Sequence, residues 1–280
     1  SSGKACAEAG ARNGEFERGW PLYERRWQVA ELQQDKHDLP LLVWTGREPL
    51  QGKSILVHAE QGLGDVIQFC RYLPLLAARG ARVSLGVTPT LIPLLTGLEG
   101  LAQLAGPGDS LGGVDYQCAL LSLPLAFGTR LETIPAPRAY LHADEARVAR
   151  WRGRLGVQRA PRVGLAWSGN PRHFNDRHRS IALARLAAQL PKGIEYVSLQ
   201  QSVRAGDQAA LAELCGPRHF GGDLADMADT AALCELVDMV VCVDTAVAHL
   251  AAAMGRTVWL LLPYSPDWRW LLGRRDSPWY

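Results

Sequence analysis

The stretch between residues 236 and 263 constrains the fold of this chain more than any other part. It contains an apolar run rich in valine at 237–243 and a second apolar run at 257–262. A short, nearly continuous apolar run is typical of a strand buried on both faces of a parallel sheet. Residues 246–254, between the runs, predict a short helix that Gly255 ends. The order strand, turn, helix, strand therefore indicates an open α/β sheet.

The turn in this stretch carries residues suited to beginning a helix. Asp244 and Thr245 are natural N-cap residues, and Ala246 is the first residue of the predicted helix. Ligands of open α/β sheets bind beyond the carboxyl ends of the strands, so we expect the unpaired amides at 245–247 to face a ligand site. Such a helix start favours an anion, most often a phosphate. His249, one turn further on, can approach the same ligand, although a packed core role also suits it.

The same alternation of strand and helix occurs twice along the chain, in two halves of similar length. This predicts two doubly wound sheets facing each other across a cleft. The N-terminal domain is expected at 43–155 and the C-terminal domain at 156–280, with the charged helix at 144–155 joining them. The predicted strands are 53–58, 82–87, 115–121, 161–167 and 194–199, with further alternation through 91–95 and 140–141. The predicted helices are 66–79, 180–190, 207–214 and 230–236. Asp144 and Ser180 are expected to cap the helices at 144–155 and 180–190, and Pro74 is expected to kink the helix at 66–79.

Residues 1–42 carry a helical pattern and a connector rather than strands. Phe16, Trp20, Tyr23 and Trp27 fall on one face of a helix. The segment resembles a worn, terminal tetratricopeptide repeat, and such repeats bury their faces by stacking in an array. A simple N-terminal helix packed on the next domain is the alternative.

Composition excludes several classes of protein. The formal net charge of +2 argues against a nucleic-acid partner, and no stretch is apolar for long enough to predict a transmembrane helix. The first residues lack the apolar core of a signal peptide. Six scattered cysteines form no CxxC pair, which indicates buried free thiols in a reducing cytoplasm. We therefore expect a cytoplasmic protein.

A glycine-rich turn, Gly62-Leu63-Gly64-Asp65, follows the strand predicted at 53–58. Glycines let a backbone approach a ligand closely. The third glycine of a dinucleotide fingerprint is missing, which disfavours a nicotinamide enzyme. Asp65 is a candidate general base, since a helix start helps to keep a carboxylate ionised. Asp65 and Gln68 also fit a capping pair, which is the structural alternative.

The loop after the strand at 161–167 is strongly basic. Residues 170–180 hold three arginines and two histidines within eight positions. Arginine forks bind phosphate oxygens in pairs, so this loop and the helix start after Thr245 could hold a diphosphate from two sides. On charge pattern alone, the loop would be a solvated surface segment. No second His or Cys stands at metal-ligand spacing from His249, so no metal site is predicted.

Together these residues resemble one family. Gly64-Asp65 with Pro74, the loop up to Arg179, and Asp244-Thr245-Ala246 with His249 are similar to the signature of the heptosyltransferase-like (glycosyltransferase family 9 type) GT-B glycosyltransferases. The branch most similar is the bacterial one in which this domain follows tetratricopeptide repeats. Many heptosyltransferases carry a phosphate-binding lysine where this chain has Arg179, and that change alters the geometry of the cation.

The resemblance implies two Rossmann-like domains, with the acceptor on the first, the nucleotide sugar on the second, and no metal or other cofactor. It implies a metal-independent, inverting transfer of a hexosyl or heptosyl group from a nucleotide diphosphate sugar to an acceptor hydroxyl on a protein, peptide or glycan. Asp65 is then the catalytic base. The expected diphosphate ligands are Arg179, Asp244, Thr245, Ala246 and His249, and further donor or acceptor contacts are expected from Gly62, Gly64, Gln68, Ser168, Asn170 and Arg172.

Two other functions fit the same sequence. A sugar-nucleotide epimerase would act on the sugar carbon itself, and release of free nucleotide without an acceptor would reveal it. A non-catalytic module that binds a sugar nucleotide, or docks through a repeat array, would bind without turnover. Fold analogy does not decide between these readings.

Overall fold

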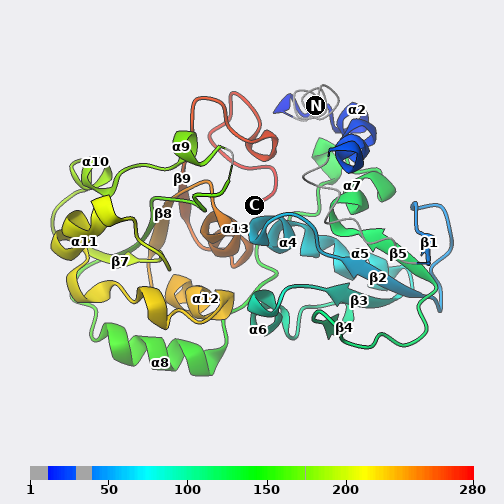
Figure 1. The fold of residues 1–280 in the computed structure, drawn as a ribbon, viewed down its shortest axis with the longest axis horizontal. Coiled ribbons are helices and arrows are strands. Elements are labelled where there is room, and N and C mark those ends of the chain that lie inside the picture. Colours follow the sequence, from blue (N-terminus) through cyan, green and yellow to red (C-terminus); the bar gives the residue numbers. More distant parts are fainter. Residues whose placement is uncertain (1–11, 30–39, 174) are drawn as a thin grey trace. The chain divides into compact units, whose positions relative to one another are not determined.

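The structure, a computed structural model, describes residues 12–29, 40–173 and 175–280. The chain forms two compact units (Figure 1). Unit 1 runs to Pro137 and also takes in the last residues, Ser265–Tyr280, and unit 2 is Arg138–Tyr264. The segment Ser265–Tyr280 is called the return segment below.

Unit 1 is built on a parallel sheet of five strands in the order β1-β5-β2-β3-β4, counted over the described residues. Its central strand, β2, follows the alternating apolar stretch predicted at 53–58, and its last four residues are buried. The chain moves from β2 to β3 on one side and later to β5 on the other, so the carboxyl ends of β2 and β5 flank a switch point. The strands are β1 Leu42–Val43, β2 Ser54–His58, β3 Arg82–Gly86, β4 Leu101–Ala105 and β5 Tyr116–Ala119.

The helices of unit 1 are short and are interrupted by 3-10 turns. The helix predicted at 66–79 is two helices, α4 and α5, separated by a 3-10 turn at Cys70–Tyr72, because Pro74 in the first turn of α5 has no N–H to continue the ladder. The helices and 3-10 turns of this unit are α2 Phe16–Tyr23, η1 Glu24–Gln28, α4 Leu63–Phe69, η2 Cys70–Tyr72, α5 Leu73–Ala78, η3 Pro89–Leu91, α6 Ile92–Leu95, η4 Leu120–Ser122, α7 Leu123–Ala126, η5 Leu131–Thr133 and η9 Trp268–Trp270.

Unit 2 has a parallel sheet of four strands in the order β7-β6-β8-β9. Its switch point lies between the carboxyl ends of β6 and β8, which pair from Val163 with Met239 to Ala166 with Cys242. The strands are β6 Arg162–Ala166, β7 Glu195–Ser198, β8 Met239–Val243 and β9 Val258–Leu261. The helices and 3-10 turns are α8 Glu145–Leu155, α9 Asp176–Arg179, α10 Leu183–Ala187, η6 Ala205–Asp207, α11 Gln208–Leu214, η7 Gly216–Arg218, η8 Gly221–Asp223, α12 Met227–Glu235 and α13 Ala246–Ala253.

The α/β class and the parallel sheets predicted from the sequence are confirmed, but the boundaries of the compact units differ from 155/156. Helix α8, capped by Asp144 as predicted, belongs to unit 2 because Trp151 is buried and bonds Asp229 of α12 through its indole N–H. The return segment belongs to unit 1 because Trp268 and Trp279 are buried against Phe16.

Helix α2 packs on its own unit through the face predicted from the sequence. Phe16, Trp20 and Tyr23 are buried, while Trp27 lies in the following 3-10 turn and is partly exposed. This is the arrangement of a simple helix packed on the domain. The remainder of the predicted repeat and connector, at 1–11 and 30–39, lies outside the described residues.

Two further predictions from composition can be compared with the described part of the chain. Its five cysteines, Cys70, Cys118, Cys215, Cys234 and Cys242, are buried free thiols, and Cys6 lies outside the described residues. No helix among the described residues is both long and apolar enough to cross a membrane.

Candidate functional site

The switch point of unit 2 brings together two of the segments predicted to carry chemistry. Ser168 and Gly169 follow β6, and Asp244 and Thr245 follow β8. Since β6 and β8 are neighbours in register, their carboxyl ends meet at one edge of the sheet. The two segments are 70 or more residues apart in sequence, yet the parallel pairing places both on the side where open α/β sheets hold ligands.

Arg179 joins these segments. Its Nη1 donates a hydrogen bond of 2.9 Å to the carbonyl oxygen of Asp244, and its side chain is 14% exposed. A Cβ at Gly169 would lie 2.6 Å from Nη2 of Arg179, so only a glycine lets the guanidinium lie against this backbone. The structure thus places a cation directly beside the turn that leads into α13.

The loop that carries Arg179 is fixed by hydrogen bonds at its base. Ser180 Oγ accepts the N–H of Gly169 at 3.0 Å and donates to Asp176 at 2.8 Å. The predicted role of Ser180 as a helix cap is wrong. Helix α10 begins later, at Leu183, and the buried carboxylate of Asp207 accepts the Leu183 N–H at 2.8 Å. The Ser180 hydroxyl is used instead to tie the loop to the end of β6.

The N-terminus of α13 leaves polar groups without partners. Thr245 is the N-cap residue in extended conformation, but its side chain makes no capping hydrogen bond, contrary to expectation. Its Oγ1 is buried and has no hydrogen-bond partner. The amides of Ala246 and Val247, in the first turn, have no acceptor within the helix by geometry. Both residues are partly exposed, so this helix start can receive an anion.

His249 lies one turn into α13, as predicted, and is 5% exposed. Its Nε2 is 3.9 Å from Oδ1 of Asp244, which is an electrostatic contact rather than a hydrogen bond. Over the described residues, no group of His, Cys, Asp and Glu side chains is arranged to hold a metal ion. His249 thus lies beside the turn that leads into α13.

Several other polar residues of the basic loop are exposed to solvent. Asn170, Arg172 and Arg177 are exposed, and the Asn170 side chain accepts the backbone N–H of Arg172 at 3.0 Å. Ser168 is buried, and its backbone N–H donates to Gln200 Oε1 at 3.0 Å. Of the three arginines that marked this loop in the sequence, Arg179 is the one that reaches the start of α13.

In unit 1, the glycine-rich turn begins α4 in a way that differs from the prediction. Gly62 is the N-cap, Gly64 lies in the first turn, and the helix begins at Leu63 rather than Val66. Asp65 closes the turn, since its Oδ2 accepts the N–H of Gly62 at 2.9 Å. Gln68, the expected capping partner, is completely buried, and neither polar atom of its side chain has a hydrogen-bond partner.

Arg269 of the return segment forms an ion pair with the other oxygen of Asp65. The Arg269 side chain is 9% exposed and that of Asp65 is 18% exposed. Burial alone would lower the pKa of Arg269, but the carboxylates of Asp267 and Asp65 outweigh burial and raise that pKa well above its usual value. Sequence reasoning missed Arg269 because 204 positions separate it from Asp65 and no local motif marks it.

A second polar cluster adjoins this turn. Gln61 has a left-handed backbone with φ of 62°, and its Nε2 donates to the Tyr23 hydroxyl at 2.9 Å. The completely buried Arg26 binds both oxygens of Glu60 at 2.8 Å. Burial raises the pKa of Tyr23 above its ordinary value, so the phenol stays protonated. Glu60 and Gln61, just before α4, are therefore both hydrogen-bonded to residues 23–26.

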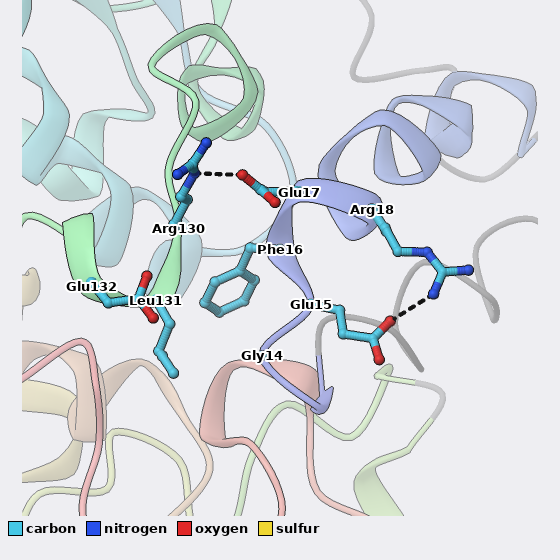
Figure 2. Close-up of a pocket in the computed structure, with 8 residues that line it drawn as sticks. All are labelled: Gly14, Glu15, Phe16, Glu17, Arg18, Arg130, Leu131 and Glu132. Carbon is cyan, nitrogen blue, oxygen red and sulfur yellow. Dashed lines mark hydrogen bonds and ion pairs between the residues drawn. The ribbon is translucent and has the colours of Figure 1, made fainter.

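Two hollows on unit 1 lie away from the residues predicted to bind donor or acceptor. One, of about 280 Å³, has Phe16 at its centre, with Glu17 turned toward Arg130 and Glu15 toward Arg18 (Figure 2). Four of its charged side chains are thus already paired. The other, of about 360 Å³, is lined by Trp27, His58 and Ser122, among others.

Comparisons with known proteins find a family model that matches part of the chain, a sequence relative and solved structures with a similar fold. Residues 202–266 match the family model described as Glycosyltransferase family 9 (heptosyltransferase). Protein FlbA of Caulobacter vibrioides is 29% identical over 288 residues, which cover 94% of this chain and 48% of FlbA. The chain therefore spans about half the length of that relative. The matched region 202–266 contains α13 and its turn, but neither Asp65 nor Arg179.

Solved structures have a similar fold. A glycosyl transferase family 9 protein from Veillonella parvula has a TM-score of 0.59 at 15% identity, covering 78% of this chain and 83% of that one. The ADP-heptose lps heptosyltransferase II of E. coli has a TM-score of 0.54 at 17% identity, covering 76% and 86%. The chain thus has an α/β, Rossmann-like fold similar to that of the family 9 heptosyltransferases, and residues 202–266 carry that family's sequence signature.

Proposed function

We propose that this chain is a metal-independent, inverting glycosyltransferase that moves a sugar from a nucleotide diphosphate sugar to an acceptor hydroxyl. The observation that carries the proposal is the switch point of unit 2. There the Arg179 guanidinium, the buried Thr245 hydroxyl without a partner and the first amides of α13 lie around one turn. These are the groups that bind the oxygens of a diphosphate.

The proposed chemistry assigns different tasks to the two units. The start of α13 and Arg179 stabilise the charge that develops on the departing nucleoside diphosphate, so fixed dipoles and a cation replace a metal ion. Asp65 takes the proton of the acceptor hydroxyl as the hydroxyl oxygen attacks the anomeric carbon. The bond from that carbon to the diphosphate oxygen breaks on the opposite face, which inverts the configuration.

Other parts of the proposal rest on the family resemblance. The acceptor is a protein, peptide or glycan bound by unit 1, and the donor is bound by unit 2. The protein works in the cytoplasm, and its transferase domain follows tetratricopeptide repeats in the chain. The match to FlbA, which is about twice as long as the matched chain, supports a larger native protein.

Calorimetry with a panel of nucleoside diphosphates, in buffer containing a metal chelator, tests the donor site. We expect one nucleotide to bind and Arg179→Ala to weaken it. A second assay follows diphosphate release from the matching nucleotide sugar with and without acceptors. Release that depends on an acceptor supports the transferase, whereas release without any acceptor supports the epimerase. Failure of every nucleotide to bind contradicts the proposed donor site.

One observation favours the non-catalytic alternative. Both oxygens of Asp65 already have partners, from Gly62 and Arg269. If these contacts serve stability alone, unit 2 would bind a nucleotide sugar without turnover. Binding without turnover under every acceptor would support that module.

A further inference from the structure

Arg269 makes more contacts that fix its guanidinium than a surface arginine usually makes. Its Nη1 donates to Asp267 at 2.8 Å, and its Nη2 donates to Asp65. The guanidinium lies 4.5 Å from the ring centre of Trp268 and 5.8 Å from that of Phe69. These contacts fix the plane of the guanidinium, and therefore the oxygen of Asp65 that it meets.

The ion pair leaves Asp65 able to accept a proton. A carboxylate can accept about four hydrogen bonds, two on each oxygen. The Gly62 amide takes one position on Oδ2 and Arg269 takes one on Oδ1. Each oxygen thus keeps a free position, and the side chain remains partly exposed. The two partners orient the carboxylate without using up its capacity as a base.

The charges around Arg269 point the same way. One guanidinium faces two carboxylates, since Asp267 and Asp65 both contact it. Asp267 alone would balance the cation, so Asp65 is held by a cation that is shared. The shared cation therefore orients the Asp65 carboxylate without pairing with it alone.

Stability alone is a weak explanation for this arrangement. A buried ion pair often contributes little to folding, because both charges lose water. The Nε of Arg269 is also buried without a hydrogen-bond partner, which adds a cost. The return segment is already anchored by Trp268 and Trp279, which pack on Phe16 and Phe69. We propose that Arg269 is a positioning residue that aims the Asp65 carboxylate at the acceptor hydroxyl, an inference that rests on the proposed glycosyl transfer.

The test compares Arg269→Gln and Arg269→Lys with the unaltered chain, using donor and acceptor turnover and donor binding by calorimetry. We expect Arg269→Gln to lower kcat by about 10²-fold, the cost of a misplaced catalytic group, while donor affinity stays unchanged. Arg269→Lys should lower kcat less than Arg269→Gln does, since lysine keeps the positive charge but lacks the two-pronged geometry of the guanidinium. Arg274→Gln is the matched control, because Arg274 pairs with Asp276 on the same segment but Asp276 is exposed.

A double variant separates positioning from structure. In the Asp65→Asn background, Arg269→Gln should cause no further loss of turnover if it acts through Asp65. Equal losses in both backgrounds, or full kcat in Arg269→Gln, would overturn the inference while leaving the transferase intact. Tryptophan fluorescence shows whether Arg269→Gln folds. If it does not, the test uses Arg269→Lys instead, and a kcat equal to that of the unaltered chain in this variant contradicts the inference. If the unaltered chain has no turnover with any donor and acceptor, the proposed function fails and this inference fails with it.

Discussion

The N-termini of α4 and α13 occupy similar places in their sheets but differ in the charged groups around them. Each helix follows a strand at the carboxyl edge of a parallel sheet, after a short turn. In α4, the carboxylate of Asp65 meets the Gly62 amide, so the helix start already holds an anion of its own. In α13, the Thr245 side chain caps nothing, and Arg179 lies beside the turn.

The difference decides which helix start suits a phosphate. A helix N-terminus attracts an anion through its free amides and its dipole. A carboxylate in the first turn satisfies that attraction and repels a second anion. We therefore assign the diphosphate to α13 and proton transfer to α4. The following predictions address the two assignments in order of expected effect.

Asp65→Asn should lower turnover by roughly 10² to 10⁴, the usual contribution of a general base, because the amide cannot take the proton. Donor affinity measured by calorimetry should remain near that of the unaltered chain, since the donor site is proposed to lie on unit 2. Unchanged turnover would end the assignment of proton transfer to α4. A parallel loss of donor affinity would indicate that α4 also holds the diphosphate.

Arg179→Ala should raise the Kd of the nucleoside diphosphate about 10- to 100-fold, the equivalent of a lost hydrogen bond to a charged group. The matched control is Arg177→Ala, because Arg177 lies on the same loop, is exposed and contacts His178. Equal affinity losses in the two variants would show that the loop acts through general charge and not through the position of Arg179.

Gly169→Ala should weaken nucleotide binding about tenfold, close to 1.4 kcal/mol, because a Cβ would displace the Arg179 guanidinium. Gly153→Ala is the control, since nothing lies within 4 Å of a Cβ placed there and Gly153 sits inside α8. Unfolding in urea should show Gly153→Ala to be as stable as the unaltered chain or more stable. Full affinity in Gly169→Ala would mean that Arg179 does not need its present place.

Thr245→Val should have the smallest effect, a loss of about threefold to tenfold in nucleotide affinity from one missing hydrogen bond. The free protein should lose no stability, because the Thr245 hydroxyl has no partner to lose and valine suits the extended backbone. Calorimetry and urea unfolding measure the two quantities on the same variant. A marked loss of stability with unchanged affinity would show that the hydroxyl serves the fold instead.

Local patterns predicted the elements that carry the site in unit 2. The valine-rich run and Gly255 located β8 and α13, whose observed end is followed by Gly255 with a φ of 71°. Strand β4 was missed because Leu101–Ala105 has no clean alternation and is largely exposed or half-buried. The helix at 66–79 was expected to kink at Pro74, and it is divided into α4 and α5 just before that proline, although it begins three residues earlier than predicted.

Contacts between residues far apart in the chain could not be predicted from the sequence. Arg179 stood out by charge, but its place against Gly169 and Asp244 depends on the pairing of β6 with β8. Asp65 was recognised as either a base or a cap, and the structure shows that it takes part in capping while meeting Arg269. Arg269 lies between two tryptophans near the end of the chain, a pattern that predicts nothing about Asp65.

The return segment also bears on the order in which the chain folds. Unit 2 is one continuous stretch, so all of its contacts are available once residue 264 has left the ribosome. Unit 1 lacks Trp268 and Trp279, which pack on Phe16, until the return segment has also been synthesised. Since domains form as they emerge, we expect the second unit to be finished before the first. Until then, the apolar face of α2 would be exposed to solvent, and a chaperone could cover it.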